Sequence, residues 1–254
     1  MIKDKLIAHR GWRNRYPENT LPAINAAIEI GAQHIEIDIQ LTADGVPVLC
    51  HDKLLQRLSG SDQDITRSNF SQIEKLSAYE PQRLGNAFLS TPIPTLKDCV
   101  ALIKKSCHVT LYVELKTESI DAFGSDAVLD AVLPNLQSIR QHCFLISFDS
   151  DILQLARQRG WQHIAPVLNS FEQAFSAETT RLSPNLIFCD KNLLSNENKL
   201  EKIAYPTAIY EVDDYHQAIL LLDQGASLIE TFSIGELITV YSHNEQTLSG
   251  KSDE

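Results

Sequence analysis

Short apolar segments alternate with amphipathic segments along almost the whole chain. The apolar segments are rich in Val and Ile, which is typical of parallel strands that are buried on both faces. The predicted strands are residues 6–9, 34–39, 109–115, 143–147, 163–168, 185–189, 207–211 and 227–231. This rhythm of strands and helices indicates an α/β protein built from βαβ units.

Helices are predicted between the strands where apolar residues recur with helical spacing. Residues 20–30 illustrate the pattern, because Asn19 precedes them as a good N-cap and Gly31 follows them as a good C-terminal cap. Similar segments are residues 96–105 after Thr95, 151–159 after Ser150 and 215–223. Eight strand–helix units predict a (β/α)8 TIM barrel, with an open doubly wound sheet as the alternative. A length of 254 residues suits one such barrel, so we predict a single domain over residues 1–254.

One connection is longer than a barrel loop requires. Between the second and third predicted strands lies a polar stretch, residues 53–91, in which we predict one helix at 71–77 and little other regular structure. A long excursion of this kind is often a lid or a substrate-facing insertion, and a plain surface loop is an equally good interpretation. We therefore expect a small insertion after the second strand.

The second predicted strand carries two acidic residues on one face. Because side chains at i and i+2 share a face, Glu36 and Asp38 point one way and the isoleucines between them point the other. In a barrel the isoleucines would pack on the outer helices, and the carboxylates would face inward near the C-terminal mouth. Two carboxylates there repel each other, and a divalent cation such as Mg²⁺ or Ca²⁺ would relieve the repulsion.

The third strand repeats this pattern with Glu114 and Lys116 on one face. Glu114 is the natural third metal ligand, and Lys116 supplies positive charge for an anionic substrate. Taken alone, this strand is explained equally well by a Glu–Lys ion pair inside the barrel. The acidic residues on the neighbouring second strand favour the interpretation of Glu114 as a metal ligand.

Two histidines are expected at the same mouth. His9 ends the first strand and is suited to acid–base catalysis, while Arg10 after it offers a planar fork to phosphate oxygens. Asp44-Gly45 predicts a hairpin whose return arm brings His51 back to the mouth. We expect Asp52 to cap the turn rather than to orient His51.

The bulk composition limits the possible partners. A formal net charge of −11 excludes long nucleic acids and anionic membrane surfaces as partners, but permits a small anionic substrate at a locally positive site. The five cysteines include no C-x-x-C pair and are expected to be free, mostly buried thiols. There is neither a signal-peptide pattern nor an apolar run long enough to span a membrane, so a cytoplasmic location is expected. The oligomeric state stays open.

Six ordered blocks of sequence resemble one known family, the glycerophosphodiester phosphodiesterases. They are His9-Arg10-Gly11, Pro17-Glu18-Asn19-Thr20, Glu36-x-Asp38, Thr42-x-Asp44-Gly45, His51-Asp52 and Glu114-x-Lys116, and they cover about residues 6–116. Agreement in the order and spacing of all six blocks is far more specific than one motif.

The resemblance implies a TIM barrel with an insertion after its second strand, and hydrolysis of glycerophosphodiesters to sn-glycerol 3-phosphate and an alcohol. The roles that it implies are metal ligation by Glu36, Asp38 and Glu114, acid–base catalysis by His9 and His51, and phosphate contacts from Arg10 and Lys116. Where the family often has a tryptophan on the seventh strand this chain has Tyr210, a candidate glycerol-facing wall. The eighth strand ends in Glu230-Thr231-Phe232 instead of the family's usual Thr-Asp pair.

Three other hypotheses compete with this one. A phosphodiesterase of the lysophospholipase D type would use the same scaffold with a wider apolar mouth. A catalytically silent barrel would serve as a binding module, but such proteins usually lose a ligand or a histidine, and every expected position is filled here. An unrelated barrel enzyme, such as a sugar-phosphate isomerase, would not require both histidines together with Glu-x-Asp and Glu-x-Lys.

Overall fold

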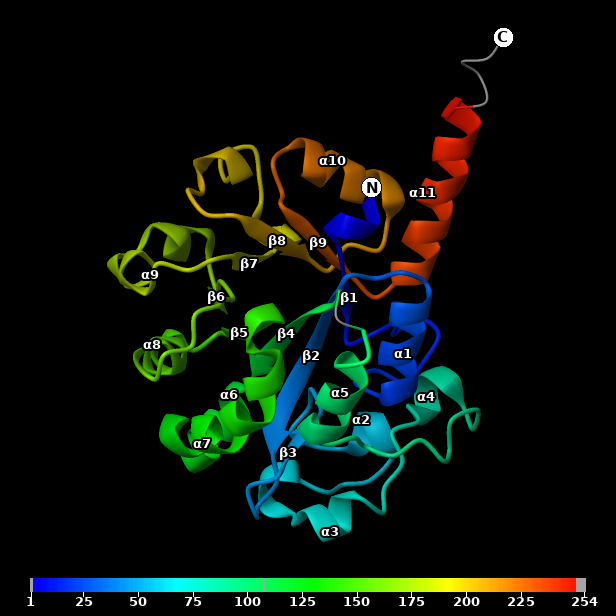
Figure 1. Ribbon diagram of the computed structural model, residues 1–254, viewed down its shortest axis with the longest axis vertical. Coiled ribbons are helices and arrows are strands. Elements are labelled where there is room, and N and C mark those ends of the chain that lie inside the picture. The colour runs from blue at the N-terminus through cyan, green and yellow to red at the C-terminus, as the bar shows by residue number, and fades with distance from the viewer. Residues whose placement is uncertain (1, 107, 250–254) are drawn as a thin grey trace.

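Eight parallel strands form a nearly closed barrel in the computed structural model, which describes residues 2–106 and 108–249 (Figure 1). The strands are β1 (Leu6–His9), β2 (His34–Leu41), β4 (Thr110–Leu115), β5 (Cys143–Ser147), β6 (Ile164–Pro166), β7 (Ile187–Asp190), β8 (Thr207–Tyr210) and β9 (Leu228–Thr231). Their order is β6-β5-β4-β2-β1-β9-β8-β7, and a parallel bridge between Val167 and Phe188 joins the two ends. The predicted barrel is therefore confirmed over the alternative of an open sheet.

Helices surround the strands (Figure 1). The principal ones are α1 (Leu21–Glu29), α5 (Leu96–Ile103), α6 (Thr117–Phe123), α7 (Ser125–Leu136), α8 (Ser150–Gln158), α9 (Ala177–Leu182), α10 (Tyr215–Asp223) and α11 (Ile234–Ser249). Short 3-10 segments lie at η1 (Ile2–Lys5), η2 (Ile65–Arg67), η3 (Gln137–His142), η4 (Phe171–Phe175), η5 (Lys191–Leu193) and η6 (Leu200–Lys202).

Two of the predicted helix starts were wrong by one residue. Thr20, not Asn19, caps α1, and its hydroxyl accepts a hydrogen bond from the Ala23 amide. Asn19 has a positive φ of 55° and uses its amide group on Asp38 instead. The N-cap of α8 is Asp149, so the helix begins at Ser150. In both cases two neighbouring residues have good capping side chains, and only the backbone conformation chooses between them.

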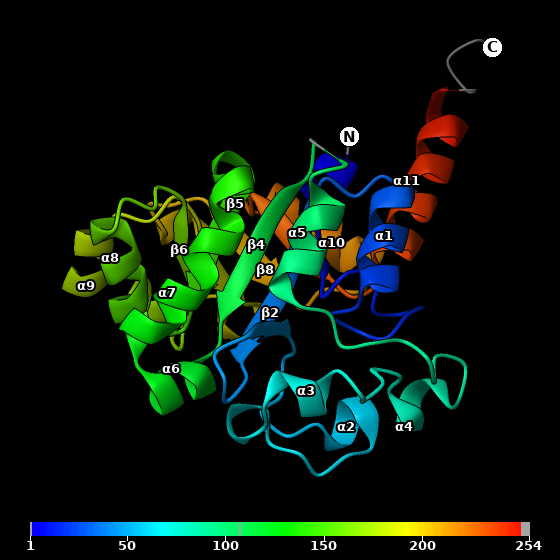
Figure 2. The same cartoon turned by 60° about the horizontal axis from the view of Figure 1, so that its bottom comes forward.

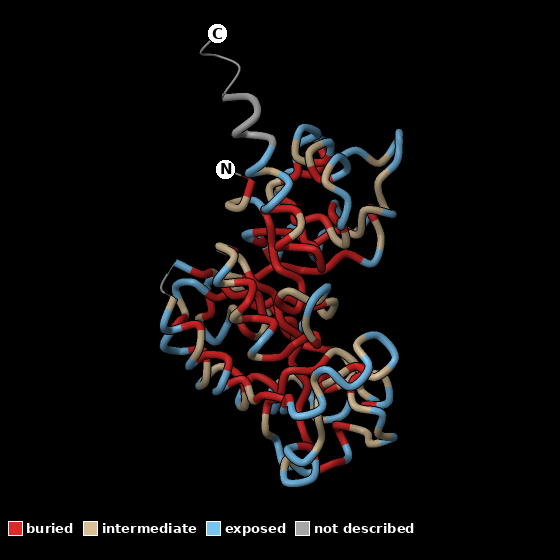
Figure 3. The backbone as a smooth tube through the Cα atoms, turned by 90° about the vertical axis from the view of Figure 1, so that its right-hand side faces the viewer, coloured by how far each residue is buried: buried red, intermediate tan, exposed pale blue. Residues whose placement is uncertain are grey.

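The isoleucines and the acidic residues that alternate along β2 lie in two different environments. Ile35, Ile37 and Ile39 are almost completely buried in the large core between the strands and the outer helices. The barrel interior holds a second apolar cluster, which includes Ile7, Tyr112, Ile146, Val167 and Phe188. Figure 3 shows the buried parts of the chain in the interior and most exposed parts around the outside. The acidic residues of β2 share neither apolar cluster, so they require another partner.

The insertion after β2 is more regular than the sequence suggested. It follows the hairpin strand β3 (Pro47–Leu49), which pairs antiparallel with β2, and contains α2 (Gln56–Ser59), η2, α3 (Phe70–Ile73) and α4 (Pro81–Leu84). The helix predicted at 71–77 is only the short α3. Figure 2 shows the whole segment gathered at one end of the barrel. It packs around a small core of its own that includes Leu55, Leu58 and Ile65.

Two other expectations concern single features of the chain. Cys50, Cys99, Cys143 and Cys189 are free and buried, as predicted, and Cys107 lies outside the described residues. Within residues 2–106 and 108–249, no helix has the length and apolar character that a membrane crossing needs.

The turn after β1 depends on a glycine. Gly11 has φ +77°, and a Cβ there would lie 2.7 Å from the Ala23 carbonyl carbon. We expect Gly11→Ala to lower the free energy of unfolding by about 2–5 kcal/mol, combining about 1–2 kcal/mol of left-handed strain with about 1–3 kcal/mol of overpacking. Gly45→Ala is the matched control, because φ there is +78° but nothing lies within 4 Å of the added Cβ. Urea unfolding measures both losses, and equal losses would contradict the packing argument.

Candidate active site

Strand register brings the predicted acidic residues together. β1 pairs with β2 so that His9 lies opposite Glu36, and β2 pairs with β4 so that Asp38 lies opposite Glu114. His9 ends β1 and Glu114 lies one residue before the end of β4, so these pairs lie at the end of the barrel where active sites form. Oxygen atoms of Glu36, Asp38 and Glu114 approach within 4.8 Å of one another, so the three carboxylates could hold one cation.

The two predicted phosphate-binding cations lie beside this cluster. Arg10 Nε is 3.0 Å from Asp38 Oδ2, and the Arg10 backbone amide donates to Glu36 Oε2 at 3.1 Å. Lys116 Nζ donates to Glu114 Oε1 at 2.7 Å and lies 3.5 Å from Asp38 Oδ1. All five side chains are buried. Negative and positive groups are therefore crowded into one small volume that excludes most water.

The electrostatics of the carboxylates favour an added positive charge. Burial raises the pKa of Glu36 well above its ordinary value, and the nearby Asp38 and Glu230 carboxylates raise it further. Burial also raises the pKa of Glu114. Burial acts in the same direction on Asp38, but Arg10 and Lys116 outweigh it and lower that pKa. Among the residues that the structure describes, Glu36 Oε1 and Asp38 Oδ1 are buried without a hydrogen-bond partner, so the cluster offers hard oxygen ligands of the kind that Mg²⁺ and Ca²⁺ prefer.

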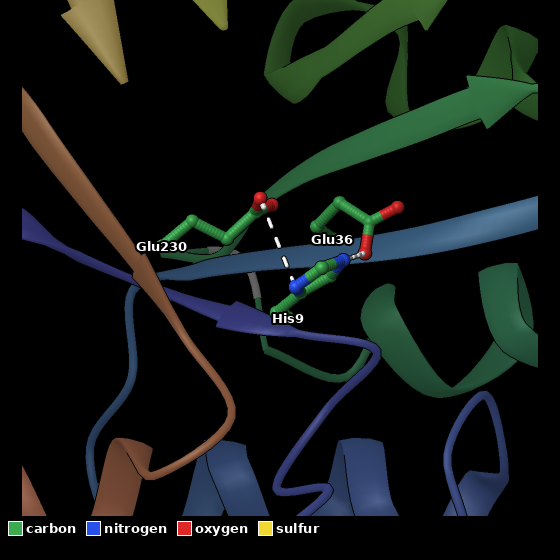
Figure 4. Close-up of side chains that lie close together, drawn as sticks. All are labelled: His9, Glu36 and Glu230. Carbon is green, nitrogen blue, oxygen red and sulfur yellow. Dashed lines mark ion pairs between the residues drawn. The ribbon is translucent and has the colours of Figure 1, made fainter. Parts of the chain in front are cut away.

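His9 lies between two carboxylates (Figure 4). Its Nε2 is 3.6 Å from Glu36 Oε2, and its Nδ1 is 3.9 Å from Glu230 Oε2 on β9. The ring stacks on Phe232 with centroids 4.5 Å apart. Burial, reinforced by the Arg10 charge, lowers the pKa of His9 well below its ordinary value, which favours a neutral ring. A neutral, fixed imidazole is suited to accept a proton.

His51 reaches the same pocket from the hairpin arm. Its Nδ1 lies 2.7 Å from Asp52 Oδ1. The expectation that Asp52 serves only as a turn cap was therefore wrong, because its carboxylate contacts the ring directly. Because Asp52 follows His51 directly in sequence, a turn cap was the simpler prediction. The directions of the two side chains, which decide whether they touch, are set by the hairpin.

One pocket of about 140 Å³ joins these groups. His9, Arg10, His51, Glu114 and Lys116 line its polar side, together with Glu211 and Glu230. The facing wall is apolar and comes from the opposite strands, with Phe148, Phe188 and Tyr210 among its residues. Tyr210 thus lies on a wall of the pocket, as its position on the seventh parallel strand suggested.

A third histidine near the carboxylates takes no part in the pocket. His34 begins β2, and it is not among the residues that line the pocket. Its Nδ1 lies 3.1 Å from Tyr112 Oη on β4, and the two rings pack together with centroids 5.9 Å apart. His34 is therefore a packed residue of the barrel with a polar partner of its own.

Sequence reasoning assigned no role to four charged residues around the pocket. Glu230 is buried beside His9, and its Oε1 has no hydrogen-bond partner in the described part of the chain. Glu211 Oε1 lies 3.7 Å from His9 Nδ1. The buried Glu18 forms an ion pair with Arg57, which also pairs with Asp52. Glu18 is part of one of the six matching blocks, and Glu211 and Glu230 lie at or near the ends of predicted strands. Arg57 lies in the insertion, where no local pattern marks it.

The fold and the pocket together define a class of protein. This is an α/β barrel whose C-terminal mouth carries a cluster of carboxylates, two histidines and the positively charged side chains of Arg10 and Lys116. The chain belongs to the Glycerophosphoryl diester phosphodiesterase family, whose model matches residues 9–231.

Curated relatives agree with this assignment. Glycerophosphodiester phosphodiesterase 1 of Bos taurus is 35% identical over 152 residues, which cover 60% of this chain and 45% of the relative. A glycerophosphodiester phosphodiesterase of Caldanaerobacter subterraneus subsp. tengcongensis is 38% identical over 102 residues, covering 40% of this chain and 41% of the relative. The match thus spans less than half the length of each of these relatives.

Solved structures support the fold. An Oleispira antarctica phosphodiesterase in complex with the product sn-glycerol-3-phosphate superposes with a TM-score of 0.83 at 22% identity, covering 94% of this chain and 96% of that one. A glycerophosphodiester phosphodiesterase from Thermotoga maritima has a TM-score of 0.70 at 23% identity, covering 92% and 97% of the two chains.

Proposed function

We propose that the protein hydrolyses glycerophosphodiesters to sn-glycerol 3-phosphate and an alcohol, with a divalent cation held by Glu36, Asp38 and Glu114. The observation that carries the proposal is a pocket lined by Glu114, His9 and His51, with Glu36 and Asp38 beside Glu114 in one carboxylate cluster. Family membership and the product named for the Oleispira antarctica structure support the substrate class.

The residues fit a hard cation such as Mg²⁺ or Ca²⁺. The cluster offers oxygen ligands, and two of its buried oxygen atoms find no hydrogen-bond partner within residues 2–106 and 108–249. When bound, the cation would neutralise charge on the phosphate and polarise an attacking hydroxyl. Arg10 and Lys116 border the same pocket and would hold phosphate oxygens.

The two histidines would divide the proton transfers between them. One removes the proton from the attacking hydroxyl, and the other protonates the oxygen of the leaving alcohol. The attacker is water or the glycerol 2-hydroxyl of the substrate, and in the second case water then opens a cyclic phosphate. Tyr210 on the facing wall would contact the glycerol carbons.

The proposed partner is therefore a small anionic molecule in the cytoplasm, bound by a single catalytic domain over residues 1–254.

The insertion at residues 53–91 is the segment from which a broader substrate preference would arise. Lysolipids are the second candidate substrate class, and Leu54 and Leu89 of the insertion, which are 55% and 50% exposed, are apolar side chains that a lipid chain could contact.

A coupled assay for glycerol 3-phosphate tests the proposal directly. We expect release from glycerophosphocholine, glycerophosphoethanolamine, glycerophosphoglycerol or glycerophosphoinositol in the presence of Mg²⁺ or Ca²⁺. Release of choline from lysophosphatidylcholine, with little from glycerophosphocholine, would instead favour the lysophospholipase D type. No turnover of any of these substrates would overturn the proposed function.

A further inference from the structure

One arginine of the insertion contacts carboxylates on three segments. Arg57, on α2, donates from Nε to Asp52 Oδ2 at 2.6 Å. Its terminal nitrogens donate to Glu18 at 2.9 and 2.6 Å and to Glu80 Oε1 at 3.3 Å. Because a guanidinium is planar and its donors are rigidly arranged, these contacts set the three carboxylates in fixed relative positions.

The contact with Asp52 leads to His51. One carboxylate oxygen of Asp52 contacts His51 Nδ1 at 2.7 Å, and the other accepts from Arg57. With both oxygens engaged, the carboxylate cannot rotate freely. Burial acts against its ionisation, but the hydrogen bonds from His51 and Arg57 outweigh burial and lower the pKa of Asp52 to about 2. Asp52 therefore stays charged and directs His51 Nε2 away from itself.

The contact with Glu18 has other support. Glu18 also accepts from Arg10 at 3.1 Å and from Arg13 at 2.7 Å. Loss of Arg57 would therefore leave Glu18 with two arginines, and Arg10 would keep Asp38 as well. The phosphate-binding side of the pocket thus depends less on Arg57 than His51 does.

The position of Arg57 is set by the insertion's own core. Leu55 and Leu58, on either side of it in sequence, are buried in the insertion's apolar cluster. The Leu58 carbonyl accepts hydrogen bonds from the amides of Tyr79 and Glu80. The backbone that carries Arg57 is therefore packed on the insertion's core, and the ion pairs with Asp52, Glu18 and Glu80 place its guanidinium.

We propose that Arg57 is a positioning residue, through which the insertion orients His51 by way of Asp52. This inference rests on the proposed function, because it takes His51 as a group that transfers a proton. It gives the insertion a role in completing the active site.

The kinetic test uses Arg57→Met, Asp52→Asn and the double variant. We expect Arg57→Met to lower kcat by about 10–100-fold, the usual effect of losing a supporting contact, with KM changed by less than about twofold. Because both residues act through one contact, the double variant should be no slower than Asp52→Asn alone. Arg57→Lys should recover part of kcat, since it keeps a cation beside Asp52.

Arg67→Met is the matched control. Arg67 belongs to the same insertion, but its side chain is 82% exposed and its ion pair is with Asp64. We expect its kcat to equal that of the wild type. Thermal unfolding of each variant identifies any loss of the fold, and Asp52→Asn keeps the test possible if Arg57→Met does not fold.

A second readout does not depend on turnover. Nitrogen-15 spectra of labelled histidine report which ring nitrogen of His51 carries the proton, and we expect Nδ1 in the wild type and a mixture in Arg57→Met. The inference would be overturned if Arg57→Met left the His51 ring spectrum or kcat unchanged, or if it raised KM without lowering kcat. It would also be overturned if the double variant lost kcat by the product of the two single losses. A wild type without turnover but with the expected spectra would overturn only the proposed function.

Discussion

His51→Ala is expected to lower kcat/KM for glycerophosphodiesters by roughly 10²–10⁴-fold, the usual contribution of a general acid or base. His51 lines the pocket, and its Nδ1 is engaged by Asp52, so Nε2 is the nitrogen left for the substrate. The side chain is 34% exposed, so its truncation should leave no buried cavity. Steady-state kinetics with the coupled glycerol 3-phosphate assay measure the loss.

The control is His216→Ala on α10. His216 is exposed and packs edge-on against Tyr215, and it does not line the pocket. We expect activity close to that of the wild type. Near-normal activity of His51→Ala would remove His51 from the mechanism.

Chelation is expected to abolish activity, and Mg²⁺ or Ca²⁺ should restore it. The buried carboxylates of Glu36, Asp38 and Glu114 repel one another, and the pKa values of Glu36 and Glu114 are raised although Arg10 and Lys116 lie beside the cluster. A bound cation would stabilise all three as ligands. Activity after exhaustive treatment with EDTA, followed by addition of each ion, measures the dependence.

Asp38→Asn tests the site itself by calorimetric titration with each ion. The variant keeps the shape of the side chain but removes its charge, so divalent-cation affinity should fall by at least about tenfold. Asp126→Asn is the control, because that carboxylate is 79% exposed on α7 and does not line the pocket. Full activity after chelation, or equal affinity in both variants, would contradict the metal assignment.

Local pattern predicted the strands well because burial on both faces leaves a clear apolar signature. The boundaries of β1 and β5 match the prediction, and the other parallel strands differ from it by a few residues. Two helix starts were predicted one residue away from their true positions; at the first, Asn19 and Thr20 are both good caps. The backbone conformation at Asn19 decides between them. It has a positive φ, and the Asn19 side chain donates a hydrogen bond to Asp38 instead of capping the helix.

The sequence by itself indicated the strand–helix units, the insertion and the seven candidate site residues, because strand alternation and motif spacing can be read along the chain. It left an open sheet as the alternative to the barrel, and the bridge between Val167 and Phe188 decides between the two. Only the tertiary structure decided how these residues meet. Strand register set Asp38 against Glu114, the hairpin brought Asp52 onto His51, and the insertion delivered Arg57 to both Asp52 and Glu18. Contacts between residues far apart in the chain depend on packing directions and register, which no local pattern encodes.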